Sequence, residues 1–551
     1  MNTVKLPKRV NHKTPMPLIA DAYTVGSETF ASKEAKRKSI YYITFRRILE
    51  KINPDVYVKG DNRIIFHGLS RILDYLFYDG VTKEEVEESV EFLSMGQVTS
   101  KGLMRYNFPK HLWYKIVSEY NGRPPLRIKA LKEGAVCYPN EPVMTIENVD
   151  DAFSEGEMGE IAAWFESTLL KVWASSELVT QLVHWKEYCA SIVRTVYGNT
   201  KTETEIQFLA GLMLFNFGCR AGMTPQESEW LGADFLLVFG GSDTLSGAYQ
   251  AWKNGNKEPG IYTTVPALAH RNVQAYEKES DCYKTMYETS DDGAILSMVC
   301  DCYSSYDAVE KDLFPLAKHA AETNNGKTII GRFDSGNPNE QVLWLCKFAH
   351  KHGLSTVEKI LNKEWRFGTT LKMFEGDGMT FSKMKEINEE LMAHGFPPFA
   401  WGAPYGQGGG VRNDLKRDNL SAKYALCAVG EELRPVCKFS ETIEKTTLPG
   451  PLKVLRNKEA LESKRTIVFM NEPGEDALIP YFDGSIKEEP FREGYGATFQ
   501  EIRDRITEQF SSMPKTLTTE ENHNYPISEA VHEKRIQLLK QYAPKKLAQN
   551  Y

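Results

Sequence analysis

Between about residues 205 and 430, one pattern of hydrophobic and polar positions returns eight times. A short apolar run ends in glycine or a polar functional group, and a helical or loop stretch follows. The runs are LMLFNFGCR, FLLVFGGSDT, YTTVPALAH, ILSMVCDCY, TIIGRFDSG, LKMFEGDG, FAWGAPYGQGGG and SAKYALCAVG. Strands that alternate with helices are typical of parallel βα units. The pattern predicts an α/β fold with a (β/α) barrel, complete or distorted, over residues 201–449, and an active site at the carboxyl ends of the strands.

The chain on either side of these residues is patterned differently. Residues 1–200 contain two amphipathic helical stretches, FHGLSRILDYLFYDG and TKEEVEESVEFLS, short β-prone runs over 126–148, and long helices that lead into the barrel. Short strand-like runs and one helix return in residues 450–551, and the last part, 512–551, has the composition of an exposed tail. We therefore expect a second, β-rich α+β domain that both ends of the chain build together.

The composition excludes several classes of function. A chain of 551 residues needs more than one hydrophobic core, and a net charge of −7 argues against a general nucleic-acid binder. No apolar stretch reaches the ~18 residues of a membrane span, and the N-terminal segment lacks the apolar region of a secretory signal. Nine cysteines without metal-site spacing are interpreted as reduced thiols. We expect a cytoplasmic protein that binds neither nucleic acid nor membranes.

Charged and glycine-rich positions gather at the ends of the apolar runs and just after them. The acidic ones are Asp243, Asp301, Asp334 and Asp377. The basic ones are Arg220, Arg332, Arg417, Lys423, Lys438 and Lys445. The glycines of GQGGG, Gly408 to Gly410, would expose backbone N–H groups to an anion such as phosphate. Carboxylates beside phosphate-binding cations suggest either a divalent metal or the stabilisation of a developing positive charge. His270, which follows VPALA, is a further candidate.

Seven strand-end segments resemble the motifs of one enzyme family in the same order. The segments are NFGCRAG, GGSDT, VPALAH, SMVCDCYSSYDA, GRFDSGNP, FEGDG and GQGGG. The nicotinamide phosphoribosyltransferase family has FGxRG, GTDT, PAAEH, SDSYD, RPDSGNP, QGDG and GSGGG elements. The likeness also includes IADAYTVGS near the N-terminus and covers roughly residues 16–510.

The resemblance implies a fold, a reaction and an assembly. The fold is that of the type II phosphoribosyltransferases, an irregular (β/α) barrel with a second, β-rich domain. The family makes nicotinamide mononucleotide and pyrophosphate from nicotinamide and phosphoribosyl pyrophosphate in NAD salvage, with Mg²⁺. It works as a homodimer whose active sites lie at the subunit interface. The resemblance also implies ATP as an activating co-substrate, because His270 matches a histidine that the family phosphorylates.

Roles for individual residues follow from the same resemblance. Phe217 would stack on one face of the nicotinamide ring and Tyr23 of the partner subunit on the other, while Asp243 and Arg332 would hold the carboxamide. Ser297 belongs to the same substrate-binding set. The residues at the ribose, the metal or the reacting centre would be Asp301, Asp334, Gly376 and Asp377. Those holding phosphates would be Arg220, Gly408, Gly409, Arg417, Lys423, Lys438 and Lys445.

The chain also departs from the family pattern. Ala269 stands where the family has a glutamate before the histidine, and Arg271 follows it. The family's N-terminal phosphate-binding arginine has no clean match, and Lys33 and Arg37 are the nearest candidates. Lys423 aligns only with a two-residue gap.

Other readings of the barrel stay open at this point. One is a nicotinate or quinolinate phosphoribosyltransferase on the same fold. Another is a phosphosugar aldolase or isomerase. A Schiff-base aldolase requires a lysine on a strand, and among the first seven apolar runs only LKMFEGDG contains a lysine. A third is a binding protein without catalysis, whose strand ends would have lost the charges that are present here.

Overall fold

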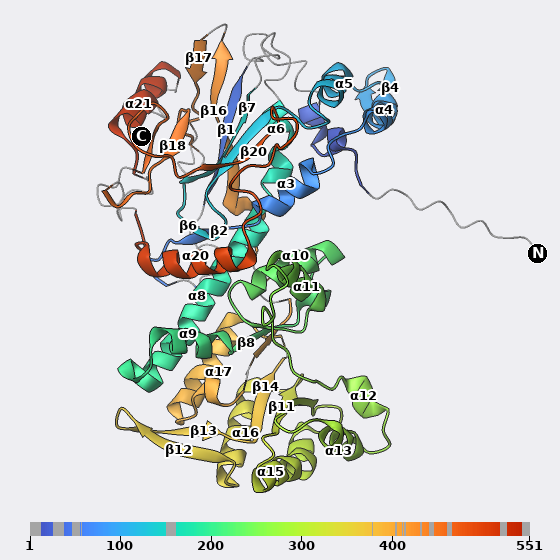
Figure 1. Ribbon diagram of the computed structural model, residues 1–551, viewed down its shortest axis with the longest axis vertical. Helices are drawn as coiled ribbons and strands as arrows, with labels where there is room; N and C mark the ends of the chain where they lie inside the picture. The colour runs from blue at the N-terminus through green and yellow to red at the C-terminus, as the bar shows by residue number, and fades with distance from the viewer. Residues whose placement is uncertain are drawn as a thin grey trace, which may run out of the picture.

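The computed structural model describes residues 13–25, 38–46, 55–56, 58–149, 161–376, 378–402, 405–409, 412, 415–429, 432–439, 446–459, 466–517 and 526–542. These residues form two parts joined by the long helix α8 (Val172–Tyr197). In Figure 1 the β-rich part lies above and the barrel below. Within the described ranges, no helix combines the length and the apolar character that crossing a membrane requires.

The lower part is a barrel of parallel strands. Its sheet has the order β10-β11-β14-β15-β8-β9. The strands are β8 (Leu214–Asn216), β9 (Gly241–Ser242), β10 (Ile295–Val299), β11 (Thr328–Phe333), β14 (Leu371–Glu375) and β15 (Tyr405–Gln407). Parallel bridges from Gly241 to Thr263 and from Ala267 to Ser297 place segment 263–267 between β9 and β10, which closes the ring. The predicted α/β fold with an irregular barrel is confirmed, and the first seven apolar runs supply its seven positions.

Helices surround this sheet on its outer side (Figure 1). They are α9 (Glu203–Gly211), α10 (Pro225–Leu236), α11 (Leu245–Asn254), α12 (His270–Gln274), α13 (Glu279–Thr289), α15 (Phe314–Thr323), α16 (Pro338–Lys351) and α17 (Phe381–Ala393). Side-chain caps define several starts, because the hydroxyl of Thr224 accepts a hydrogen bond from the Glu227 N–H and that of Thr380 from the Lys383 N–H. A hairpin of β12 (Ser355–Ile360) and β13 (Lys363–Gly368) projects from the barrel.

The upper part is built on a six-stranded antiparallel sheet in the order β17-β16-β1-β7-β5-β20. The strands are β1 (Ser39–Phe45), β5 (Leu126–Ala130), β7 (Pro142–Asn148), β16 (Leu420–Val429), β17 (Glu432–Pro435) and β20 (Ile479–Asp483). Both ends of the chain therefore contribute to this sheet, and the predicted antiparallel pairing within 126–148 is present as β5 and β7. Smaller pairs are β2 (Ile64–Phe66) with β6 (Ala135–Cys137), β3 (Gln97–Thr99) with β4 (Gly102–Met104), and β18 (Leu452–Val454) with β19 (Ile467–Phe469).

The eighth apolar run, SAKYALCAVG, is not a barrel strand, so this part of the prediction is wrong. It forms β16, which pairs antiparallel with β1, Lys423 lying opposite Tyr42. An apolar run shows that a segment is extended but carries no signal about which strand lies beside it. The strands β16 and β17 therefore extend the upper sheet and not the barrel, which was expected to reach residue 449.

The remaining helices belong to the upper part. They are α3 (Leu69–Phe77), α4 (Lys83–Phe92), α5 (Lys110–Glu119), α6 (Ile161–Trp164), α7 (Glu166–Leu169), α20 (Phe499–Ser512) and α21 (Glu529–Tyr542). The predicted exposed tail needs correction, because α21 buries Val531, Leu538 and Leu539 and packs on β19.

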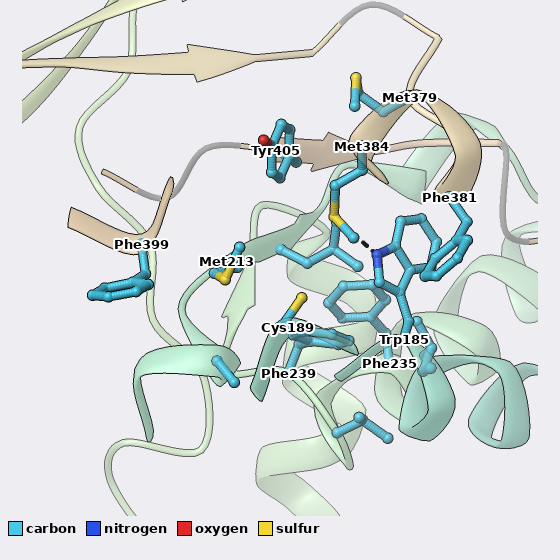
Figure 2. Close-up of a cluster of buried hydrophobic side chains, with 14 of the residues drawn as sticks. Trp185, Cys189, Met213, Phe235, Phe239, Met379, Phe381, Met384, Phe399 and Tyr405 are labelled. Carbon is cyan, nitrogen blue, oxygen red and sulfur yellow. Dashed lines mark hydrogen bonds between the residues drawn. The ribbon is translucent and has the colours of Figure 1, made fainter. Parts of the chain in front are cut away.

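Apolar packing along α8 joins the long helix to the barrel. The ring of Trp185 on α8 meets Phe381 of α17 edge to face, with centroids 5.4 Å apart. Its indole N–H lies 2.9 Å from the Met384 sulfur (Figure 2). Buried side chains from α8, α10 and α17 continue this core around the outside of the barrel.

Candidate functional site

A histidine, a carboxylate and a hydroxyl meet where β10 and β11 end. Asp301 follows β10, and its Oδ1 lies 2.9 Å from Nε2 of His270, the first residue of α12. Its Oδ2 accepts a hydrogen bond of 2.6 Å from the Ser335 hydroxyl, just after β11. The Asp301 side chain is 8% exposed and that of His270 is 42% exposed. The carboxylate is therefore fixed from two sides, while the imidazole remains open to solvent.

Arg332 brings a buried cation to the inside of the barrel. Its neighbour Gly331 faces Val309 and Leu345 of the outer helices, so Arg332 on the next position points inward. One guanidinium nitrogen, Nη2, donates to the Leu268 carbonyl at 2.8 Å, and Nε lies 3.7 Å from Oδ1 of Asp334. Nε is buried and has no hydrogen-bond partner among the described residues. A buried donor of this kind is costly unless a ligand accepts from it.

Gly376 allows Asp334 to sit against the next strand end. The Gly376 N–H donates to the Phe333 carbonyl at 3.0 Å. A Cβ at this position would lie 2.6 Å from Oδ1 of Asp334, so a larger residue would displace the carboxylate. Gly376 is therefore required by close packing.

Phe217 and Asp243 lie at the ends of the adjacent strands β8 and β9. The Phe217 N–H donates to the Gln407 carbonyl at 2.8 Å, and the Asp243 N–H donates to the Asn216 carbonyl at 2.9 Å. The Asp243 carboxylate accepts a hydrogen bond from the Thr264 hydroxyl. Ser297, buried on β10, is tied through its backbone to segment 263–267 by the Ser297 N–H to Pro266 carbonyl bond of 2.9 Å. Together with His270, Asp301, Arg332 and Asp334, these residues form what we call the mouth cluster.

The anion-binding candidates Arg220, Gly408 and Gly409 lie at the same end of the barrel. Arg220 is exposed and closes the short turn Gly218–Arg220, which follows β8. Gly408 and Gly409 follow β15, the neighbour of β8. The two loops are adjacent, because a Cβ at Gly218 would lie 3.5 Å from the Gly408 carbonyl oxygen.

A second basic site lies in the upper part. Arg46, Lys423 and Lys438 line a pocket of about 270 Å³ with Thr447. Arg46 follows β1, and its N–H donates to the Asn419 carbonyl at 2.6 Å. Sequence reasoning missed Arg46 and suggested Lys33 or Arg37, both of which lie outside the described residues. The missed signal was available, since Arg46 directly follows the apolar run SIYYITF, as the barrel site residues follow theirs.

Tyr23 and Arg417 also belong to the upper part. Tyr23 is 76% exposed, and its hydroxyl donates to Asp21 at 3.2 Å. Ser167 donates to the same carboxylate at 3.1 Å. Burial raises the pKa of the neighbouring Glu166, while the positive charge of Arg417 acts in the opposite direction. Tyr23 and Arg417 therefore share an acidic neighbourhood.

The structure thus divides the predicted residues into two groups. Phe217, Arg220, Asp243, His270, Ser297, Asp301, Arg332, Asp334, Gly376, Gly408 and Gly409 gather at the barrel mouth. Tyr23, Arg417, Lys423 and Lys438 lie on the upper part. The predicted residues Asp377 and Lys445 lie outside the described residues.

A divalent metal fits this mouth only if a substrate supplies most of its ligands. Across the described ranges, no three His, Cys, Asp or Glu side chains lie close enough to hold a metal ion. Mg²⁺ commonly keeps several waters and binds one or two carboxylates together with substrate phosphates. Asp301 and Asp334, which follow the paired strands β10 and β11, would supply these one or two carboxylate ligands.

Comparisons with known proteins agree with this geometry. Residues 212–469 match the Nicotinate phosphoribosyltransferase (NAPRTase) family. A nicotinamide phosphoribosyltransferase of Xanthomonas campestris pv. campestris is 27% identical over 367 residues, covering 66% of this chain and 72% of that protein.

Two solved structures share the fold. Human nicotinic acid phosphoribosyltransferase superposes with a TM-score of 0.57 at 14% identity, covering 95% of this chain and 100% of that one. Nicotinate-nucleotide pyrophosphorylase from Pyrococcus furiosus gives a TM-score of 0.52 at 16% identity, covering 92% and 98%. The family match and the Xanthomonas relative show that residues 212–469 form a domain of the nicotinate phosphoribosyltransferase family, within a phosphoribosyltransferase of NAD salvage. The two solved structures show the shared fold.

Proposed function

We propose that the base used by this phosphoribosyltransferase is nicotinamide. The observation that carries the proposal is that a hydrogen-bond acceptor, Asp243, and a hydrogen-bond donor, Arg332, both bond to residues of one segment, 264–268, in the mouth cluster. Thr264 donates to the carboxylate of Asp243, and four residues later the Leu268 carbonyl accepts from Arg332. A carboxamide offers an NH₂ donor for Asp243 and a carbonyl acceptor for Nε of Arg332, which has no hydrogen-bond partner among the described residues. The activity named for the Xanthomonas relative supports the same choice.

Nicotinate would fit this pair less well. Its carboxylate has no donor for Asp243, and the two like charges would meet in a partly desolvated pocket, which costs several kcal/mol. Arg332 would offset part of that repulsion. Each ~1.4 kcal/mol corresponds to a factor of ten, so we expect at least about a hundredfold preference for nicotinamide in kcat/KM.

The proposed reaction is a displacement at the ribose anomeric carbon of phosphoribosyl pyrophosphate. The pyridine nitrogen donates its lone pair to that carbon while the bond to the pyrophosphate oxygen breaks, and nicotinamide mononucleotide and pyrophosphate form. Positive charge develops on the ribose, where Asp301 and Asp334 would stabilise it. His270 and Ser335 hold Asp301 in place, so little reorganisation is needed. The neutral pyridine nitrogen requires no general base.

The developing negative charge on pyrophosphate requires cations and N–H donors. At the barrel these would be Arg220 and the backbone of Gly408 and Gly409. Bound Mg²⁺ would supply further charge neutralisation at the phosphate oxygens. The pocket of Arg46, Lys423 and Lys438 is a second site of matching charge.

ATP would act through His270. Because Nε2 of the imidazole contacts Asp301, the ring nitrogen Nδ1 is the one open to accept the γ-phosphoryl group, with release of ADP. Incubation with ATP should add an acid-labile phosphate that is absent in His270→Ala. If ATP leaves both the label and the turnover unchanged, this role is wrong, and the transfer reaction stands without it.

We further propose that the complete site forms between two subunits of a homodimer. Tyr23 and the Lys423 pocket lie on the upper part, and the mouth cluster lies on the barrel, so the tyrosine of one subunit would face Phe217 of the other. Heterodimers of an inactive Tyr23→Ala chain and an inactive Phe217→Ala chain should regain activity, because one of their two sites would be intact. Verified heterodimers that stay inactive would contradict the shared site.

The test of the substrate is a direct assay. Purified protein with Mg²⁺ and phosphoribosyl pyrophosphate is given nicotinamide or nicotinate, and mononucleotide formation is followed. The Asp243→Ser variant should narrow the preference, mainly by losing nicotinamide activity. The control is Asp281→Ser, on the outer helix α13. A wild-type preference for nicotinate, or an unchanged preference in Asp243→Ser, would refute the assignment and favour the nicotinate transferase that the human structure represents.

A further inference from the structure

A small apolar cluster fills the barrel below Phe217 and is separate from the two large cores. It consists of the buried side chains Phe215, Ile330 and Phe374, with the half-buried ring of Phe217 packed against them. They come from β8, β11 and β14, and from the turn after β8. The function proposed above assigns Phe217 to the substrate and leaves the other three without a role.

The orientation of the strands places this cluster inside the barrel. Gly331 faces the outer helices, so Ile330 on the preceding position faces the interior, as Arg332 does. Tyr405 points outward, where its hydroxyl donates to Asn388 of α17, so the next residue on β15, Gly406, faces inward.

Gly406 is required by the packing of this cluster. A Cβ at Gly406 would lie 2.7 Å from the Phe374 ring and 3.2 Å from the Phe217 ring. The two aromatic side chains therefore cover the strand that lies between β14 and β8, and they leave no room for a methyl group there.

Phe374 is the centre of the cluster. It meets Phe217 edge to face, with centroids 5.4 Å apart and planes at 64°, and it meets Phe215 at 6.5 Å and 82°. It also lies directly opposite Arg332 in the parallel pairing of β11 and β14. One residue therefore contacts the proposed stacking ring and is the cross-strand neighbour of the proposed carboxamide donor.

We propose that Phe374 is the positioning and size-limiting residue of the base subsite. It fixes the tilt of Phe217, so that one face of that ring stays available for stacking, and it closes the barrel beneath the ring. The subsite then accepts a single six-membered heteroaromatic ring and excludes fused two-ring bases. This inference rests on the proposed function, because it assumes that a pyridine base stacks on Phe217.

The test compares Phe374→Ala with a conservative and a control variant. Phe374→Leu keeps apolar volume without an aromatic edge. Phe314→Ala removes an aromatic side chain from the outer face of the barrel, where Phe314 meets Phe348 edge to face at 5.3 Å. KM for nicotinamide, KM for phosphoribosyl pyrophosphate and kcat are measured for each variant. Activity toward quinoline-3-carboxamide, a fused two-ring analogue, is measured alongside.

Phe374→Ala should raise KM for nicotinamide about tenfold and change KM for phosphoribosyl pyrophosphate less than about twofold. It should also gain activity with quinoline-3-carboxamide relative to nicotinamide. Phe374→Leu should restore part of the affinity for nicotinamide, and Phe314→Ala should leave both KM values unchanged. If wild type prefers nicotinate, the same comparison is made with nicotinate and quinoline-3-carboxylate.

Two results would overturn the inference in an active enzyme. One is an equal rise of both KM values in Phe374→Ala, which indicates general loss of structure. The other is wild-type enzyme that uses the two-ring base as well as the one-ring base. Wild-type enzyme that transfers phosphoribosyl to no pyridine base would refute the proposed function itself, and this inference with it.

Discussion

Two clusters of charged side chains differ in how far they are exposed to solvent. One is the mouth cluster at the strand ends of the barrel. The other, which we call the junction cluster, consists of His67, Arg71, Glu133 and Asp234, where the segment before and within α3 meets α10. In Figure 1, α3 belongs to the upper part and α10 to the top of the barrel. The junction cluster therefore links the two parts of the molecule.

In the junction cluster, the cations and carboxylates pair closely. Nε2 of His67 lies 3.0 Å from Asp234, and Nη2 of Arg71 lies 2.6 Å from both oxygens of that carboxylate. Burial alone would raise the pKa of Asp234, but Arg71 and His67 lower it to about 2. Burial alone would lower the pKa of His67, but Asp234 and Glu133 raise it to about 9. Each charge is held in its ionised form by its neighbours.

The mouth cluster is more exposed to solvent than the junction cluster. The side chains of His270 and Asp334 are 42% and 31% exposed, whereas those of His67 and Asp234 are 8% and 1% exposed. Among the described residues, each cluster holds a buried nitrogen without a hydrogen-bond partner, Nε of Arg332 and Nδ1 of His67. The comparison shows that charge clustering alone does not indicate a binding site. What separates the two clusters is the exposure of the mouth cluster at the strand ends. We expect the junction cluster to govern stability and the mouth cluster to govern activity.

The largest effect is expected for Asp234→Asn. The substitution leaves His67 and Arg71 buried beside a neutral amide, and breaking a buried ion pair in this way typically costs about 3–5 kcal/mol of unfolding free energy. Activity per folded molecule at low temperature should stay close to wild type. Urea or thermal unfolding measures the first effect, and the transfer assay measures the second.

The matched control for this variant is Glu288→Gln. Lys284 and Glu288 form an exposed pair at 3.7 Å on α13, and exposed helix pairs contribute only about 0.3–0.5 kcal/mol. Equal losses of stability in Asp234→Asn and Glu288→Gln would contradict a structural role for the junction cluster.

A smaller free-energy effect, on activity alone, is expected for Asp334→Asn. The side chain is 31% exposed and lies 3.7 Å from Arg332, so the variant should unfold at the wild-type temperature. Removing one fixed group that stabilises transition-state charge commonly lowers kcat about a hundred- to a thousandfold, or about 2.7–4 kcal/mol. Steady-state kinetics and a melting curve on the same preparation separate the two effects. A melting temperature that falls as far as in Asp234→Asn would remove the distinction between the clusters.

The sequence predicted the mouth cluster better than the upper site, and sheet topology explains why. In a parallel sheet, all carboxyl ends lie at one edge, so Arg332, Asp301 and Asp243 could be grouped simply because each follows an apolar run. In the antiparallel upper sheet, successive strands end at opposite edges. Arg46 at the end of β1 and Lys423 within β16 meet only because those two strands pair. That pairing was not visible in the pattern, and so β16 was placed in the barrel and Arg46 was overlooked.

The junction cluster was beyond sequence reasoning for a related reason. His67 and Arg71 flank the start of α3, Glu133 lies in the turn before β6, and Asp234 is on α10, more than 160 residues after His67. None of them follows a run that marks a site. The fold alone brings them together, and their pairing depends on the packing of the two parts of the molecule.

The smallest expected effect is the pH dependence of stability that His67 of the junction cluster contributes. The folded pKa of His67, about 9, lies above the ordinary value of about 6.5. Its contribution to stability is therefore fully present below about pH 6.5 and is lost as the pH rises through 9. From these two values, about 2 kcal/mol should disappear between pH 7 and pH 9.

Lys186 complicates a measurement on wild type alone. Burial lowers its pKa to about 8, so its buried charge destabilises the fold near neutral pH, and that penalty decreases as the pH rises.

The useful quantity is therefore the difference in unfolding free energy between wild type and His67→Gln, in which the Lys186 contribution cancels. Because glutamine keeps a neutral donor in place of the imidazolium, the difference should be large at pH 7 and about 2 kcal/mol smaller at pH 9. Urea unfolding at the two pH values measures it. A difference that stays constant would show that His67 does not carry the charge assigned to it, and the junction cluster would then owe its stability to Arg71 and Asp234 alone.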